Sequence, residues 1–143
     1  MDEKNNITEQ LKELITTYSF NKNTLSQYLE LPLDSIGDLA NGNMDFLPDD
    51  LAYRFKLFNR IMFLYTSATE DKDLKLTAFL KVLLSYHGLS KKTVAAMAGV
   101  ETKDIENVLS DPPGKVSEES RYKIAVTVMS LRFFLKDCEP EKL

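Results

Sequence analysis

The sequence is poor in the residues that build metal sites and covalent cross-links. Its 143 residues contain one cysteine, Cys138, one histidine, His87, and no tryptophan. A single cysteine excludes a disulfide framework and a cysteine-based zinc site. A single imidazole leaves little for a metal site or a histidine-based catalytic triad. Because a glycine-rich phosphate loop and a nucleophile elbow are also lacking, we expect no metal, no cofactor and no enzymatic activity.

Long apolar runs are lacking as well. No stretch approaches the roughly 20 apolar residues that span a bilayer, and the first residues, MDEKNN, are charged and polar, unlike a signal peptide. Hydrophobic residues still make up 43% of the chain, enough for a folded core. We therefore expect a soluble, cytoplasmic protein without a membrane partner.

The chain also has no excess of positive charge. The chain has 18 Lys+Arg against 22 Asp+Glu, a net charge of -4, which weighs against binding to nucleic acid. The acidity is uneven, however. Residues 1–75 hold 8 basic and 13 acidic side chains, whereas residues 76–143 hold 10 and 9. The argument from charge against binding to nucleic acid therefore applies mainly to the first half of the chain.

What the chain does contain is an internal repeat. An offset of 69 aligns residues 11–65 with 80–134 without a gap, with seven identities such as Leu11/Leu80 and Tyr53/Tyr122. Apolar positions pair throughout, and the last such pairs are Phe55/Ile124 and Leu57/Val126. Unrelated amphipathic helices can be slid into register by chance, but a shared register over several helices favours a tandem duplication.

Each repeat predicts four helices, because no segment alternates at period 2 as a strand would. In the first unit, a helix ends near Tyr18, a second begins after Asn21 or Asn23, and Pro32 and Pro48 open the third and fourth. In the second unit the predicted helices are 75–87, 91–98, 102–109 and 117–136, with Ser90, Thr102 and Ser117 as candidate caps. The predicted fold class is all-α: two tandem four-helix units, 1–66 and 75–143, joined by a short polar connection, 67–74.

The fourth helix of each unit is apolar almost all round, in 58–65 and again in 126–135. A helix that is apolar on every side is buried on every side. We expect the two units to be packed through these long fourth helices within one chain. The alternative is that the helices form the seam of a homodimer.

The most specific stretch is Lys91–Val108. It places the small Ala95 where two short helices would cross and Gly99 where a left-handed turn is needed, above apolar Val94, Ala98, Val100, Ile105 and Val108. This stretch resembles the helix-turn-helix of bacterial repressors. With one helix before it and a longer one after it, residues 76–134 resemble the Cro/C1 (lambda-repressor-like) family.

The matching stretch of the first unit, 22–39, departs from this pattern. Ser26 replaces the small alanine, which fits, but Glu30 stands in place of the turn glycine and would strain a left-handed turn. Its third helix also lacks any cation on the surface that would face DNA. We interpret the first unit as a degenerate copy that does not read DNA.

The resemblance implies a transcriptional regulator that binds double-stranded DNA through the second unit. Lys91 and Lys92 would hold phosphate at a helix N-terminus. Thr102, Lys103 and Asn107 would face the major groove, with Lys103 reading guanine and Asn107 reading adenine. Basic residues at the start of the fourth helix, where such proteins touch the DNA backbone, are Lys115, Arg121 and Lys123.

Carboxylates on the same surface support an alternative function. Glu101, Asp104 and Glu106 lie on or beside the reading helix, where they would face phosphates. They are also explained as partners of the helix dipole. The alternative is a helical adaptor that kept the repressor-like fold without DNA binding and contacts another protein or a second copy of itself.

Overall fold

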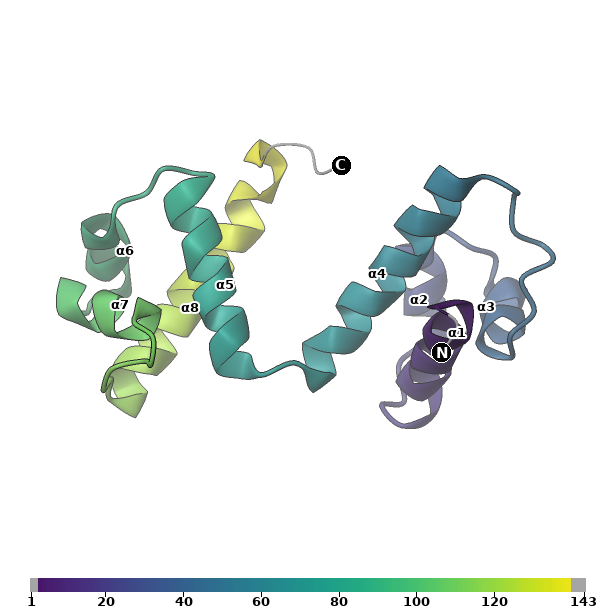
Figure 1. Cartoon of the computed structure of the whole chain (residues 1–143), viewed down its shortest axis with the longest axis horizontal. Coiled ribbons are helices and arrows are strands. Elements are labelled where there is room, and N and C mark those ends of the chain that lie inside the picture. The colour runs from purple at the N-terminus through teal and green to yellow at the C-terminus, as the bar shows by residue number, and fades with distance from the viewer. Residues whose placement is uncertain (1–2, 140–143) are drawn as a thin grey trace. The chain divides into compact units, whose positions relative to one another are not determined.

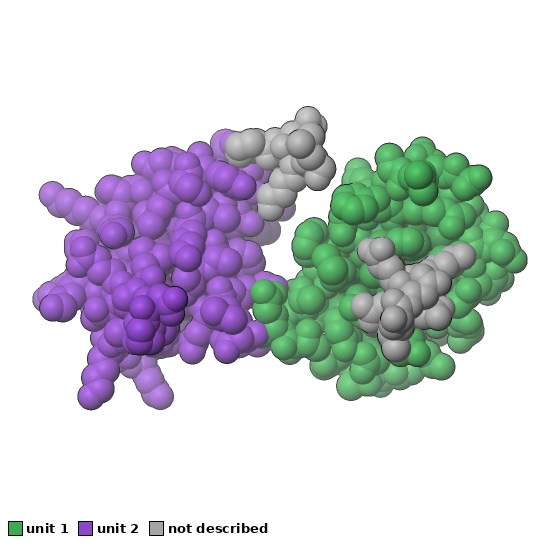
Figure 2. All heavy atoms as spheres, in the orientation of Figure 1, with its two compact units in different colours: residues 1–70 green, residues 71–143 purple. Residues whose placement is uncertain are grey.

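The computed structural model describes residues 3–139, and every regular element among them is helical. Eight α-helices are followed by a short 3-10 helix, Lys136–Cys138. The chain divides into two compact units, Met1–Glu70 and Asp71–Leu143 (Figure 2). Within this described part, no helix has both the length and the apolar character needed to cross a membrane. The predicted all-α fold class is confirmed.

Unit 1 is built around one apolar core to which all four of its helices contribute. They are α1 (Glu3–Thr16), α2 (Lys22–Leu29), α3 (Leu33–Ala40) and α4 (Leu51–Thr69) (Figure 1). Each helix places at least one fully buried side chain in this core: Leu11, Leu25, Ile36 and Ile61. Complete burial of such a side chain is worth roughly 1.5–3 kcal/mol, so the core is the main source of stability.

Unit 2 repeats this architecture. Its helices are α5 (Lys72–Ser85), α6 (Lys91–Ala98), α7 (Thr102–Leu109) and α8 (Glu118–Leu135) (Figure 1). Its core again takes at least one fully buried side chain from each helix: Leu80, Val94, Ile105 and Ile124. The predicted bounds of α6 and α7 are confirmed.

Polar caps explain where two helices of unit 2 begin. The hydroxyl oxygens of Ser90 and Ser117 accept hydrogen bonds from the backbone amides three residues on, at 3.0 and 3.1 Å, as predicted. The predicted cap at Thr102 is wrong. Thr102 is the first residue of α7, and Glu101 occupies the cap position without a side-chain hydrogen bond.

The start of α4 also differs from the prediction. The helix begins at Leu51 rather than at Pro48. The Asp50 carboxylate decides this, because it accepts hydrogen bonds from the amides of Ala52 (3.0 Å) and Tyr53 (3.3 Å). A capping carboxylate satisfies amides that have no partner within the helix.

The connection between the two units is shorter than the predicted stretch 67–74. α4 continues to Thr69 and α5 begins at Lys72, so only Glu70 and Asp71 are outside a helix. Asp71 is the cause, because its carboxylate caps α5 by accepting two backbone amides at 2.8 and 3.2 Å.

The same backbone features recur 69 residues apart. The first turn of each unit contains a left-handed residue, Ser19 (φ 51°) or Gly88 (φ 64°), and the second contains Glu30 (φ 56°) or Gly99 (φ 74°). Paired backbone hydrogen bonds close these turns: Phe20 to Leu14 and Leu89 to Leu83, then Leu31 to Ser26 and Val100 to Ala95. The two helix–turn–helix segments therefore follow the same backbone path, and Glu30 takes up the left-handed conformation despite its Cβ.

The fourth helices do not keep this register. Leu57 is 3% exposed, whereas Val126, its counterpart in the ungapped alignment, is 49% exposed. The buried residues of α8 are Ile124 and Val128, which match the buried residues of α4 at an offset of 67. The connection before the long helix is two residues longer in unit 1, and this length difference shifts the register. The predicted pairs within the fourth helices are therefore wrong.

The long helix of unit 2 is not buried on every side within its unit. Its core face carries Ile124 and Val128. The other side, here named the α8 outer face, consists of apolar residues that are between 49% and 71% exposed: Tyr122, Val126, Met129 and Phe133. Their spacing of four, three and four residues places them on one side of a helix. The pairing of α8 with α4 stays a prediction.

Replacing Gly99 with alanine should lower the free energy of unfolding of unit 2 by about 1 kcal/mol, because a left-handed conformation is unfavourable for a residue with a Cβ. Gly37→Ala is the control. Gly37 lies inside α3, with open space where a Cβ would lie, so alanine should stabilise unit 1 by roughly 0.5–1 kcal/mol. Urea unfolding followed by circular dichroism measures both. A Gly99→Ala protein as stable as the parent would contradict the strained turn.

Candidate nucleic-acid interface

α6 and α7 meet in a tight turn at Gly99. This residue has φ 74° and ψ 35°, and its amide points back to the carbonyl oxygens of Ala95 and Ala96. The Val100 amide donates to the Ala95 carbonyl at 3.0 Å. Ala95 is 2% exposed, so there is room only for a small side chain where the helices cross. The structure confirms the steric roles predicted for Ala95 and Gly99.

Apolar side chains anchor both helices from below. Val94, Ala98, Ile105 and Val108 are buried, and Val100 is partly buried against the same core. The polar side chains of α6 and α7 therefore lie on the outer surface of unit 2.

The first turns of α6 and α7 carry exposed lysines, and the N-terminus of α7 has no side-chain cap. Lys91 and Lys92 begin α6, Thr102 and Lys103 begin α7, and all four are exposed. Across residues 3–139, none of the three lysines forms an ion pair. Because Glu101 makes no side-chain capping bond, the first amides of α7 also stay open. Helix N-termini of this kind attract phosphate.

Asn107 lies further along α7, and its side chain is engaged. Its Nδ2 donates a hydrogen bond to the carbonyl oxygen of Lys115, in the connection to α8, at 3.0 Å. This contact was not predicted from the sequence. The available signal was Gly114, the glycine of a turn cluster directly before Lys115.

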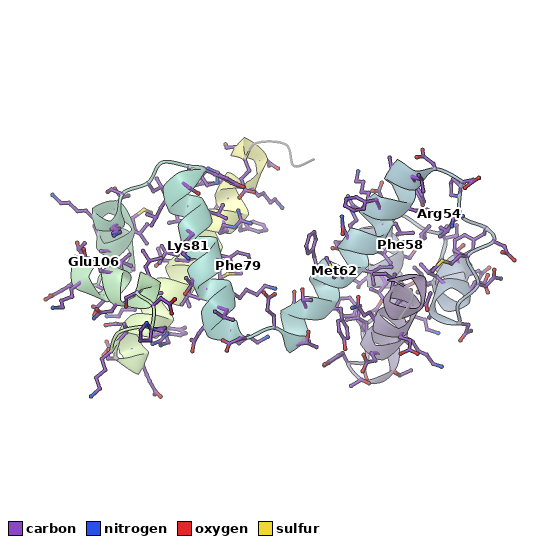
Figure 3. All side chains as sticks on the ribbon, viewed as in Figure 1. Arg54, Phe58, Met62, Phe79, Lys81 and Glu106 are labelled. Carbon is purple, nitrogen blue, oxygen red and sulfur yellow. The ribbon has the colours of Figure 1, made fainter. Side chains whose placement is uncertain are left out.

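The carboxylates of this surface are placed unevenly. Glu101 and Glu106 are exposed and Asp104 is half-buried in the first turn of α7. Figure 3 shows Glu106 on α7, whereas Lys81 is on α5. Glu106 lies one turn beyond Lys103, whereas Glu101, at the cap position, and Asp104 lie at the start of α7 beside Lys103.

The equivalent surface of unit 1 has no counterpart to these lysines on its third helix. α3 contains no lysine or arginine, and its exposed side chains include Asp34 and Asp38. Its first turn also exposes Leu33, at 47%. An acidic and apolar surface of this kind repels phosphate instead of attracting it.

A family model described as a helix-turn-helix domain matches residues 2–141. The chain belongs to this helix-turn-helix domain family. The curated proteins and the solved structures gave no match. The matched range runs through both units, and a helix-turn-helix domain is typical of DNA-binding regulators in general rather than of enzymes.

In unit 1 of this helix-turn-helix protein, hydrogen bonds hold the turn between α2 and α3 against α4. The Tyr28 hydroxyl donates to the Arg60 carbonyl at 2.8 Å. In return, Arg60 Nη1 donates to the Tyr28 carbonyl at 2.7 Å and to Glu30 Oε2 at 3.1 Å. Burial raises the pKa of Tyr28 above its usual value, an effect that the charge of Arg60 partly offsets. The residue at the position of Tyr28 in unit 2 is Met97, which is 61% exposed and has no hydroxyl to donate.

Arg60→Ala should lower the free energy of unfolding of unit 1 by about 1–2 kcal/mol, because two carbonyl or carboxylate partners lose a charged donor. The control is Lys56→Ala, which removes the same charge from an exposed position one turn earlier in α4 and should change stability by less than about 0.5 kcal/mol. Thermal unfolding compares the two. Equal losses would show that charge, and not the Tyr28–Arg60 contact, sets the stability.

Proposed function

We propose that the protein is a transcriptional regulator that binds double-stranded DNA through the helix-turn-helix of unit 2. The observation that carries this proposal is the combination of exposed lysines at the starts of α6 and α7 with an N-terminus of α7 that no side chain caps. The proposed DNA-contacting residues are Lys91, Lys92, Thr102 and Lys103, and Asn107 acts on the same surface through its hydrogen bond to the Lys115 carbonyl.

Each helix start has a separate part in this proposal. α6 meets the DNA backbone, where its first amides and the ammonium groups of Lys91 and Lys92 bind phosphate. α7 enters the major groove with its first turn, where Lys103 reaches a guanine edge and the Thr102 hydroxyl bonds to a base or a sugar–phosphate group.

We further propose that the two units are copies of one Cro/C1-like ancestor and that unit 1 has ceased to read DNA. The recurrence of two left-handed residues and their hydrogen bonds at an offset of 69 supports a duplication. The exposed Asp34 and Asp38 and the lack of a cation in α3 support the loss of reading in unit 1.

Binding to random duplex DNA should be steeply salt-dependent. The two lysine–phosphate contacts of Lys91 and Lys92 predict a loss of roughly tenfold in affinity between about 50 and 200 mM salt. Lys92→Glu and Lys103→Glu should each weaken binding, and Lys92→Glu should also lower the magnitude of the salt slope by about one or more. Fluorescence anisotropy with a labelled duplex measures both.

The control for these variants is Lys22→Glu. Lys22 begins α2 as Lys91 begins α6, so the charge change is matched at the equivalent helix start. It should leave affinity nearly unchanged. No binding by the parent protein at low salt would refute the proposal, and equal losses from both units would refute the assignment to unit 2.

A protein partner is the second candidate function, because the α8 outer face is apolar and exposed. Apolar residues with a spacing of four, three and four form the seam along which helices pair. Tyr122 and Phe133 lie at the ends of this seam, and Val126 and Met129 lie in its middle. The spacing of the four residues is therefore the same in both directions along the helix. This spacing is compatible with an antiparallel pair of identical helices, so the candidate partner is a second copy of the chain.

If the α8 outer face pairs two chains, Met129→Glu should shift the protein from dimer to monomer, because a carboxylate in the middle of an apolar seam is costly to bury. Sedimentation equilibrium over a concentration series measures the mass. Lys81→Glu, an exposed change on α5, is the control and should leave the mass unchanged. A parent protein that is monomeric at every concentration would contradict the pairing.

A further inference from the structure

One side chain holds the connection between α7 and α8 against α7. The amide of Asn107 donates to the Lys115 carbonyl at 3.0 Å, and its backbone carbonyl accepts from the Gly114 amide at 2.8 Å. The Ser110 hydroxyl donates to that same carbonyl and accepts from the Gly114 amide, both at 2.9 Å. These four residues, Asn107, Ser110, Gly114 and Lys115, form what we name the loop clamp.

The glycine of the loop clamp allows a very close approach. A Cβ at Gly114 would lie 2.7 Å from Asn107 Oδ1 and 2.8 Å from its Cγ. Any larger residue would push the Asn107 side chain away, so the amide of Asn107 is packed directly against the loop backbone.

This placement conflicts with the reading of adenine by Asn107. That contact needs Nδ2 as donor and Oδ1 as acceptor together, on one base edge in the major groove. In the structure Nδ2 is bonded to the Lys115 carbonyl and Oδ1 lies beside Gly114. To meet a base with both atoms, Asn107 would have to release the loop.

We propose that Asn107 is a positioning residue for Lys115 and not a reader of adenine, an inference that rests on the DNA binding proposed above. Lys115 is exposed and makes no ion pair in the described range 3–139. Its carbonyl is held by Asn107, and the next residue, Val116, packs against the core of unit 2. The Lys115 ammonium is thus presented beside α7 from a backbone that is already ordered, which reduces the entropy lost when it binds a phosphate.

Unit 1 lacks both the side-chain donor of the loop clamp and the lysine that the clamp positions. The residue at the position of Asn107 is Asp38, whose carboxylate cannot donate to a loop carbonyl. The connection 41–50 contains three aspartates and no lysine or arginine. The side-chain clamp and the cation that it positions therefore occur together in the unit assigned to DNA and are both missing in the other.

A double-mutant cycle in the full-length protein tests the inference. Asn107→Ala and Lys115→Ala should each weaken binding to random duplex DNA by roughly two- to tenfold and lower the magnitude of the salt slope by up to about one. The double variant should be no weaker than Lys115→Ala alone, because Asn107 acts through Lys115. Gly114→Ala, which displaces the Asn107 amide without removing it, should reproduce Asn107→Ala.

A second measurement separates positioning from reading. Affinities of the Asn107→Ala protein for duplexes that differ at single base pairs should all fall by the same factor. Loss of preference for adenine at one position, or additive losses in the cycle, would overturn this inference while DNA binding stands. A parent protein that binds no duplex at low salt would overturn the proposed function and this inference together.

Discussion

The left-handed residue between the two short helices of each unit is the constraint on which the rest of the structure depends. It changes the direction of the chain between the two short helices. The second helix therefore crosses the first, and both bury their apolar sides in one core. Gly99 meets this demand without strain because it has no Cβ. Glu30 meets it with strain, and its carboxylate lies 3.1 Å from the guanidinium of Arg60, which also bonds to the end of α2. The fold is therefore the same, but the interactions that hold the turn differ.

The two units also differ in which segments their polar side chains hold together. In unit 1 the long helix holds the turn, since Arg60 and Tyr28 exchange hydrogen bonds between α4 and α2. In unit 2, α7 holds the connection that follows it, since Asn107 donates a hydrogen bond to the Lys115 carbonyl. The first arrangement stabilises a surface that carries Asp34 and Asp38. The second orders a connection that carries an exposed lysine, so the cores are alike and the two units differ in their surface contacts.

The sequence was sufficient for the parts of the fold that local chemistry determines. The bounds of α6 and α7 follow from a serine cap and a turn glycine, both of which act within a few residues, and they were predicted correctly. The register of the fourth helices was not, because it depends on the length of the connection before them. The lysines of the candidate site were predicted from residue type and position, and their binding to DNA stays a prediction. The engagement of Asn107 was missed, because it depends on the path of a loop that no periodicity describes.

The net charge of -4 is therefore the wrong quantity for judging DNA binding. Charges act strongly only within about 8 Å at physiological salt, so the residues of the contact surface matter most. On that surface the lysines at the starts of α6 and α7 favour phosphate, while the exposed Glu101 and Glu106 oppose it. Under the proposed function, these carboxylates weaken attraction to any duplex and leave contacts to particular bases with a larger share of the binding free energy. An acidic reading helix then favours selectivity over affinity, because non-specific binding depends almost wholly on phosphate neutralisation.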